Sequence, residues 1–246
     1  MSILEARGLA KAYGGVQAVR GVSFAVDAGE LLAMIGPNGA GKTTCFNMLN
    51  GQVAPDAGEV LLAGRSLAGL RPRHVWWLGV GRTFQVQATF GSMSVRENVQ
   101  MALLSREGRV FSFLGSTSNL YREEADALLA RVAMLEHAER PCAALAYGDL
   151  KRIELAVALA NRPRVLLMDE PTAGMAPKER SALMQLAATL ARTDNIAVLF
   201  TEHDMSVVFG FATRVIVLHD GKLIAGGSPA EVRADPRVQE VYLGHA

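Results

Sequence analysis

The sequence predicts an α/β fold with a mostly parallel core sheet and an inserted helical subdomain. In the second half of the chain, apolar runs over 165–169 and 196–201 are followed by helical patterns over 178–192 and 204–212. Strands that alternate with helices are typical of a parallel sheet covered on both faces. The pattern is helical throughout residues 88–160, and this middle part interrupts the α/β alternation.

Short apolar runs separated by turn residues fill the first third of the chain. They predict four strands, over residues 2–9, 21–26, 31–36 and 59–64. The segment "DAGE" (27–30) indicates a tight turn, and "KTTCFNMLNG" (42–51) a short helix that ends at Gly51.

The middle of the chain contains three expected helices, over 94–104, 121–136 and 148–160, before Pro163. Residues 108–120 read as a loop or insertion between the first two. Near the C-terminus, residues 215–225 predict a hairpin turned by Asp220-Gly221.

Composition excludes several classes of function. Lys and Arg number 25 against 24 Asp and Glu, so charge provides no reason to expect a nucleic-acid partner. Charged residues interrupt the first apolar run, and no window offers ~18 uncharged apolar residues, so neither a signal peptide nor a membrane span is expected. Cys45 and Cys142 have no metal-binding spacing and read as reduced packing residues.

A glycine-rich segment lies between a predicted strand and a predicted helix, and it matches the pattern Gly-x4-Gly-Lys-Thr. Backbone N–H groups of such a loop converge on phosphate oxygens, and the following helix adds its positive dipole end. Lys42 can reach the β- and γ-phosphates, and the Thr43 hydroxyl can bind Mg²⁺. The expected ATP-binding residues are Gly36, Pro37, Asn38, Gly39, Ala40, Gly41, Lys42, Thr43 and Thr44.

The apolar run "VLLM" ends in two adjacent acids, Asp169 and Glu170. Buried carboxylates are costly and repel each other, so a bare pair at a strand end needs an explanation. A Mg²⁺–nucleotide site supplies one, because it needs a carboxylate at the carboxyl end of a neighbouring strand. We therefore expect Asp169 to hold Mg²⁺ and Glu170 to activate water as the general base.

Four segments in fixed order resemble the ATP-binding cassette (ABC) ATPases over essentially the whole chain: "GPNGAGKTT", "LAYGDLKRIELAVALANRP", "LLMDEPTAG" and "TEHDM". The resemblance implies a single P-loop NTPase domain over 1–246 with an N-terminal antiparallel β-subdomain. Its nucleotide-binding core would comprise residues 1–87 and 161–246, and its helical subdomain residues 88–160.

The resemblance assigns three further residues to the nucleotide site. Gln85, after "VGRTF", matches the glutamine that contacts Mg²⁺, and His203 matches the switch histidine near the γ-phosphate. Tyr13 matches the aromatic residue that stacks on adenine. Considered alone, each is an ordinary residue type for its position: a solvated loop glutamine, a structural histidine and a surface or core tyrosine.

The segment "LAYGD" occupies the position of the family's signature motif, so Ala146, Tyr147 and Gly148 would face an ATP held by a second subunit. Taken alone, the segment reads as a simple helix cap. The motif departs from Leu-Ser-Gly-Gly-Gln at Ala146 and Asp149, and the later D-loop departs at Ala176. These departures put the serine–phosphate bond and one inter-subunit contact in doubt.

Details such as "GRTFQ", the segment 108–120 and the ending "VYLG" are similar to the longer ATPase subunit of bacterial branched-chain amino acid importers. That resemblance implies ATP and Mg²⁺ as cofactors, a homodimer or a heterodimer with a homologous ATPase, membrane permeases near Phe90, and an indirect periplasmic binding protein. It places the chain peripherally on the cytoplasmic face of the inner membrane. Lipopolysaccharide exporters, soluble ABC factors and P-loop kinases or non-hydrolysing binding proteins remain alternatives.

Overall fold

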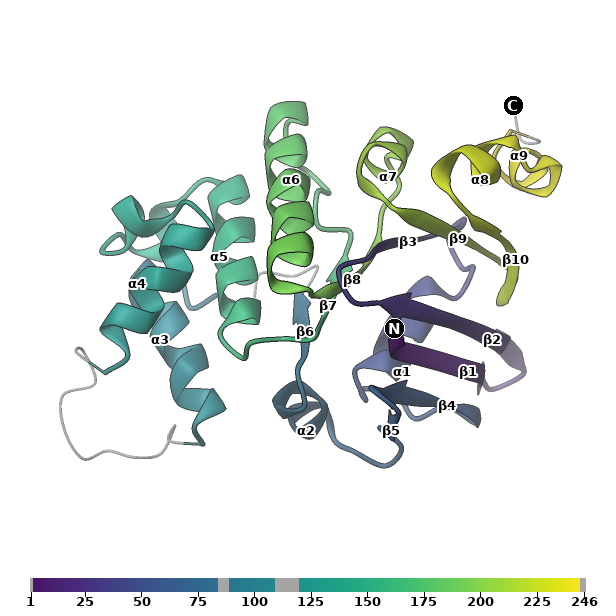
Figure 1. Cartoon of the computed structure of the whole chain (residues 1–246), viewed down its shortest axis with the longest axis horizontal. Coiled ribbons are helices and arrows are strands. Elements are labelled where there is room, and N and C mark those ends of the chain that lie inside the picture. The colour runs from purple at the N-terminus through teal and green to yellow at the C-terminus, as the bar shows by residue number, and fades with distance from the viewer. Residues whose placement is uncertain (1, 84–88, 109–119, 244–246) are drawn as a thin grey trace.

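The computed structural model describes residues 2–83, 89–108 and 120–243, with side-chain positions described up to residue 241. It contains two sheets and a group of helices at one end (Figure 1). Within the described residues, no helix is both long and apolar enough to cross a bilayer. The α/β fold expected from the sequence is confirmed.

The smaller sheet is antiparallel and has the strand order β2-β1-β4-β5. Its strands are β1 (Ser2–Tyr13), β2 (Val16–Asp27), β4 (Ala57–Leu62) and β5 (Arg65–Ser66). The first two strands are longer than the apolar runs predicted, because their outer residues face solvent and carry no apolar signal. Gly14 has a φ of 57°, and it turns β1 into β2.

The larger sheet has the strand order β10-β9-β3-β8-β7-β6. Its members are β3 (Leu31–Ile35), β6 (Val80–Thr83), β7 (Val165–Asp169), β8 (Ala197–Thr201), β9 (Arg214–His219) and β10 (Lys222–Gly227). The five strands β9, β3, β8, β7 and β6 run parallel to one another. β10 pairs antiparallel with β9 through the expected Asp220-Gly221 turn.

Both faces of the larger sheet are buried, as its continuous apolar strands predict. Along β3, Leu31 and Ile35 pack into one hydrophobic cluster, whereas Leu32 and Met34 pack into another. The first cluster lies under α5 (Tyr147–Leu159), α6 (Pro177–Asp194) and α7 (Met205–Phe211). The second cluster joins the smaller sheet to α1 (Lys42–Leu49). This second cluster contains Cys45, and burial raises the pKa of its thiol to about 12.

The helices α3 (Val95–Arg106), α4 (Arg122–Arg131) and α5 group on the left of Figure 1. Residues 121–136 do not form one helix, because α4 ends at Arg131 and Ala133 adopts a left-handed φ of 56°. Two short 3₁₀ segments follow, η2 (Leu135–His137) and η3 (Cys142–Ala144). Cys142 is buried in this region, and neither cysteine forms a disulfide.

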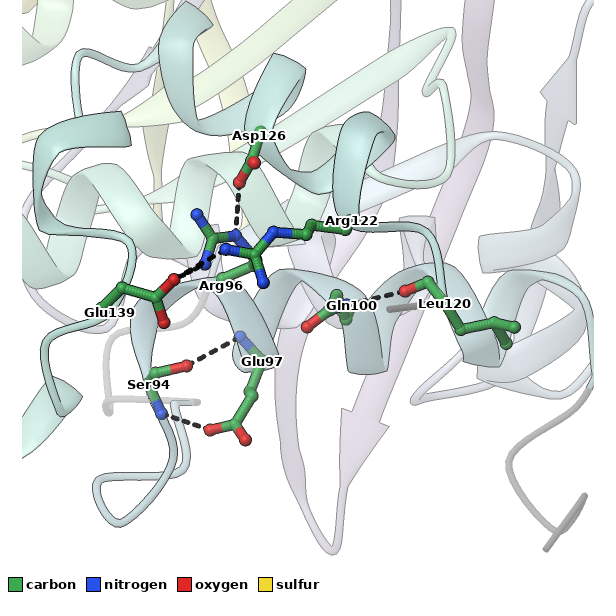
Figure 2. A network of polar contacts seen from close by, with 8 residues as sticks. All are labelled: Ser94, Arg96, Glu97, Gln100, Leu120, Arg122, Asp126 and Glu139. Atoms are coloured by element: carbon green, nitrogen blue, oxygen red, sulfur yellow. Dashed lines mark hydrogen bonds and ion pairs between the residues drawn. The ribbon is translucent and has the colours of Figure 1, made fainter. Parts of the chain in front are cut away.

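Polar contacts connect α3 to its neighbours (Figure 2). Arg96 is buried and forms ion pairs with Asp126 of α4 and with Glu139. Ser94 and Glu97 form a capping box that fixes the start of α3. These contacts attach α3 to α4 and to the chain that follows it.

Three helices were not predicted: α2 (Pro72–Trp77), α8 (Pro229–Ala234) and α9 (Pro236–Leu243). The first two have only six residues each, which is too short for a helical apolar pattern to be recognised. Each of the three begins with proline, which suits the first turn of a helix, where a backbone N–H has no partner.

Candidate functional site

The glycine-rich loop joins the end of β3 to the start of α1, as the sequence predicts. Gly41 caps α1 with a left-handed φ of 102°, and a Cβ there would lie 2.4 Å from the carbonyl oxygen of Ala18. A Cβ on Gly36 would lie 2.2 Å from the carbonyl oxygen of Leu218. The loop is therefore pressed against β2 and β9, and any side chain at these two positions would displace it.

Lys42 is the first residue of α1, and the residue is only 8% exposed. Its Nζ donates hydrogen bonds to the carbonyl oxygens of Gly36, at 2.6 Å, and Pro37, at 3.1 Å. Burial lowers the pKa of Lys42, and the charges of Glu170 and Asp169 oppose that shift. The lysine thus lies beneath the loop, within the electrostatic field of both acids. The side chain of Thr43, in the same helical turn, is exposed.

Asp169 ends β7 and is 7% exposed. Its two carboxylate oxygens have different partners. Oδ1 accepts a hydrogen bond of 2.8 Å from the Thr201 hydroxyl, and Oδ2 pairs with Nη2 of Arg82 at 3.1 Å. The buried acid is therefore stabilised by one hydroxyl and one cation.

Glu170 follows with a left-handed backbone φ of 48°. Its side chain places Oε1 2.9 Å from Nε2 of His203. Its N–H donates to the Thr201 hydroxyl at 3.0 Å. The structure thus brings Lys42, the two acids and His203 together at the carboxyl ends of β3, β7 and β8, where ligands bind in open α/β sheets.

The segment after β8 contacts the segment after β7 at a second point. Glu202 is 4% exposed, and its Oε1 accepts bonds from the N–H of Thr172, at 2.8 Å, and from its hydroxyl, at 2.7 Å. Three successive residues of the "TEH" segment therefore each bind a residue between 169 and 172.

Sequence reasoning assigned no role to Arg82 or Thr201. Arg82 donates to Asn47, Gln52 and Asp169 from β6, the neighbour of β7. Thr201 is the residue opposite Asp169 in the β7–β8 register. Both contacts arise from strand order, which the sequence does not state. The sequence offered one signal that could have found them, a polar residue at or near the end of each apolar strand.

The other predicted residues lie elsewhere. Tyr13 ends β1 and is 48% exposed, with Nζ of Lys11 5.8 Å from its ring centre. Ala146 precedes α5 without any side-chain cap bond, and Tyr147 is exposed. Gly148 is buried against Glu179 of α6, since a Cβ there would lie 3.2 Å from the glutamate carboxyl carbon. Gln85 lies outside the described residues.

Comparison with known proteins identifies the family. Residues 19–173 match the family described as ABC transporter, and residues 222–246 match the one described as branched-chain amino acid ATP-binding cassette transporter. The chain is 40% identical to the high-affinity branched-chain amino acid transport ATP-binding protein LivG of Salmonella typhimurium, over 99% of this chain and 98% of the relative. It is 39% identical to the corresponding protein BraF of Pseudomonas aeruginosa.

Solved structures agree with this assignment. A nucleotide-free ATP-binding cassette of an ABC transporter superposes with a TM-score of 0.89 at 28% identity, covering 98% of this chain and 99% of the other. A cassette in its ADP conformation gives a TM-score of 0.88, also at 28% identity, and covers 99% of both chains. Together with the loop, the acids and the histidine described above, these matches establish that the chain belongs to the ATP-binding cassette family of ABC transporters.

Proposed function

We propose that this chain is the ATP-hydrolysing subunit of an importer for branched-chain amino acids or related small molecules, bound peripherally to the cytoplasmic face of a bacterial inner membrane. The LivG and BraF relatives, similar over nearly their full length, support this cargo class. A lipopolysaccharide export ATP-binding protein of Acidithiobacillus ferridurans is 36% identical, so an exporter is the second candidate.

The observation that carries the proposed ATP hydrolysis is the contact between Glu170 and His203, beside Lys42. In the proposed reaction, water attacks the γ-phosphate of ATP in line, the bond to the β–γ bridging oxygen breaks so that ADP leaves, and Glu170 accepts the water proton. His203 orients Glu170 and donates toward the phosphate oxygens. Lys42 and the N–H groups at the start of α1 hold the phosphates and stabilise the charge that develops on them.

The residues present fit a bound Mg²⁺. Thr43 offers an exposed hydroxyl and Asp169 a carboxylate, and oxygen ligands of this kind suit Mg²⁺. Among the described residues no group of three or more His, Cys, Asp or Glu side chains could hold a metal alone. This agrees with an ion held by one or two protein ligands together with substrate phosphates. When bound, Mg²⁺ would neutralise charge on the β- and γ-phosphates.

The active assembly is a dimer in which the start of α5 faces the nucleotide of the other subunit. Two features support this arrangement. The N-terminus of α5 has no side-chain cap, and although the N–H of Asp149 bonds to the carbonyl oxygen of Ala146, those of Tyr147 and Gly148 can serve an anion. A related cassette, 26% identical with a TM-score of 0.78 over 92% of this chain, forms a dimer bound to ADP and phosphate.

The permease contact is proposed along α3, where Phe90 bonds to Asn98 near the start of the helix and Trp77 bonds to Ser105 near its end. The side chains of Phe90 and Trp77 are 58% and 47% exposed, and the backbone of Phe90 is fixed by two hydrogen bonds with Asn98. A cavity of about 370 Å³ lies between α2, α3 and α5, and it is lined in part by Ser105, whose carbonyl oxygen accepts the indole N–H of Trp77. An exposed aromatic residue beside a hollow is a suitable anchor for a partner.

The variant Glu170→Gln tests the reaction. It should bind ATP with wild-type affinity, because Glu170 does not hold the phosphates, and it should hydrolyse ATP at least ~100-fold more slowly. Phosphate release by the purified complex measures the rate. A wild-type rate would show that Glu170 is only an acid at the end of a strand.

A second experiment tests the cargo class. Leucine, isoleucine or valine, but not lipopolysaccharide, should stimulate ATP hydrolysis by the reconstituted complex.

A further inference from the structure

Thr201 occupies a position that connects the two acids of the site. It is fully buried at the end of β8, directly opposite Asp169 in the sheet register. Its hydroxyl donates a 2.8 Å hydrogen bond to Oδ1 of Asp169 and accepts a 3.0 Å bond from the N–H of Glu170. We propose that Thr201 is a positioning residue for ATP hydrolysis, because this single hydroxyl binds the carboxylate of Asp169 and the backbone N–H of Glu170.

The first part of the argument concerns the backbone of Glu170. A φ of 48° is unfavourable for glutamate and persists only where surrounding contacts enforce it. β7 ends at Asp169, so the N–H of Glu170 lies just beyond the last residue of the strand. The Thr201 hydroxyl accepts that N–H and so holds the turn. This backbone conformation directs the Glu170 side chain toward His203.

The second part concerns the orientation of the Asp169 carboxylate. Arg82 binds one of its oxygens and Thr201 the other, so the plane of the carboxylate is fixed from both sides. Without the hydroxyl, Oδ1 would lose this partner and the carboxylate could rotate about Arg82. Thr201 therefore sets the direction from which Asp169 approaches a metal.

The variant Thr201→Val removes the hydroxyl and keeps the shape of the side chain. We expect kcat to fall about 10- to 100-fold, since small displacements of catalytic groups cost up to about that much. The affinity for ATP measured without a divalent metal should stay within about twofold, because Lys42 bonds to loop carbonyls and not to Thr201. Thr201→Ser should restore most of kcat, because it restores the hydroxyl.

Thr213 provides a matched control. Its hydroxyl also accepts one backbone N–H and donates to one oxygen, both from Leu31 at 3.0 Å. Leu31 begins β3, whereas the site lies at the other end of the strands. Thr213→Val should keep a wild-type kcat, while thermal unfolding of both valine variants records any loss of stability.

A readout independent of turnover tests the Asp169 part. Electron paramagnetic resonance should show Mn²⁺ bound at least ~3-fold more weakly to Thr201→Val than to wild type, with a non-hydrolysable ATP analogue present. Unchanged Mn²⁺ affinity would overturn the role of Thr201 toward Asp169.

The proposal rests on Glu170 being the base, so Glu170→Gln is measured alongside. A slow Glu170→Gln beside a Thr201→Val that keeps wild-type kcat would overturn the role of Thr201 alone. A wild-type rate in Glu170→Gln would overturn the base assignment itself. If Thr201→Ser were as slow as Thr201→Val, the hydroxyl would not be the cause, and the proposal would fail.

Discussion

At the scale of single residues, Lys42 has two roles that its motif does not separate. Its ammonium group can reach bound phosphates, and in this structure it bonds to the carbonyl oxygens of Gly36 and Pro37. The lysine therefore also fixes the loop that it serves. Burial lowers the pKa of Lys42, and the charges of Glu170 and Asp169 oppose that shift.

We expect Lys42→Ala to weaken ATP binding at least ~10-fold, since hydrogen bonds to charged groups contribute about 1.5–3 kcal/mol. Equilibrium titration with a fluorescent ATP analogue measures this. Lys178→Ala, which removes an exposed lysine from α6, is the control and should bind like wild type. Equal affinity in Lys42→Ala and the control would contradict the assignment of the phosphate loop.

At the scale of elements, the helices α3 and α4 depend on polar contacts as well as on apolar packing. Arg96 of α3 is only 8% exposed, and its ion pairs with Asp126 and Glu139 attach α3 to these two residues (Figure 2). Arg122 also pairs with Glu139, but the side chains of both residues are largely exposed. Screening by solvent makes such an exposed pair weak, whereas a buried arginine loses hydration that only its partners replace.

We expect Arg96→Met to lower the free energy of unfolding by about 1–3 kcal/mol, because Asp126 and Glu139 lose the cation that joins them to α3. Arg122→Met should change it by less than about 0.5 kcal/mol. Urea unfolding followed by circular dichroism compares the two. Similar losses in both variants would mean that burial of Arg96 is unimportant.

At the scale of the whole molecule, the central question is whether α5 serves the nucleotide of a second subunit. The variant Gly148→Asp probes this arrangement, because it would place a negative charge against a phosphate. The structure adds a complication. A Cβ on Gly148 would lie 3.3 Å from both carboxylate oxygens of Glu179 in the same chain. An aspartate would therefore meet repulsion even in a monomer.

We predict that Glu170→Gln forms an ATP-dependent dimer and that adding Gly148→Asp abolishes it. A triple variant that also carries Glu179→Gln removes the repulsion within the chain and should stay monomeric with ATP. Size-exclusion chromatography decides the outcome. A dimer in the triple variant would show that Gly148 does not face the neighbouring nucleotide. If Glu170→Gln alone stays monomeric, the comparison is made with a homologous ATPase subunit present.

The order of the core strands along the chain, the phosphate loop and the two acids at the end of β7 could all be predicted from the sequence. Those features are local, because apolar runs, glycine spacing and strand ends are written in neighbouring residues. The sequence did not reveal α2, which is too short to show a helical pattern, nor the break at Ala133, which depends on a single left-handed residue.

The side chains that surround the acids could not be predicted, because they come from other strands of the sheet. Arg82 and Thr201 lie 87 and 32 residues from Asp169 along the chain, yet each bonds to one of its oxygens. They meet because β6 and β8 flank β7 in the sheet. The contact between Gly148 and Glu179 likewise depends on how α5 packs against α6. Strand order and helix packing bring together residues that are distant in sequence, and no local pattern records which of them will meet.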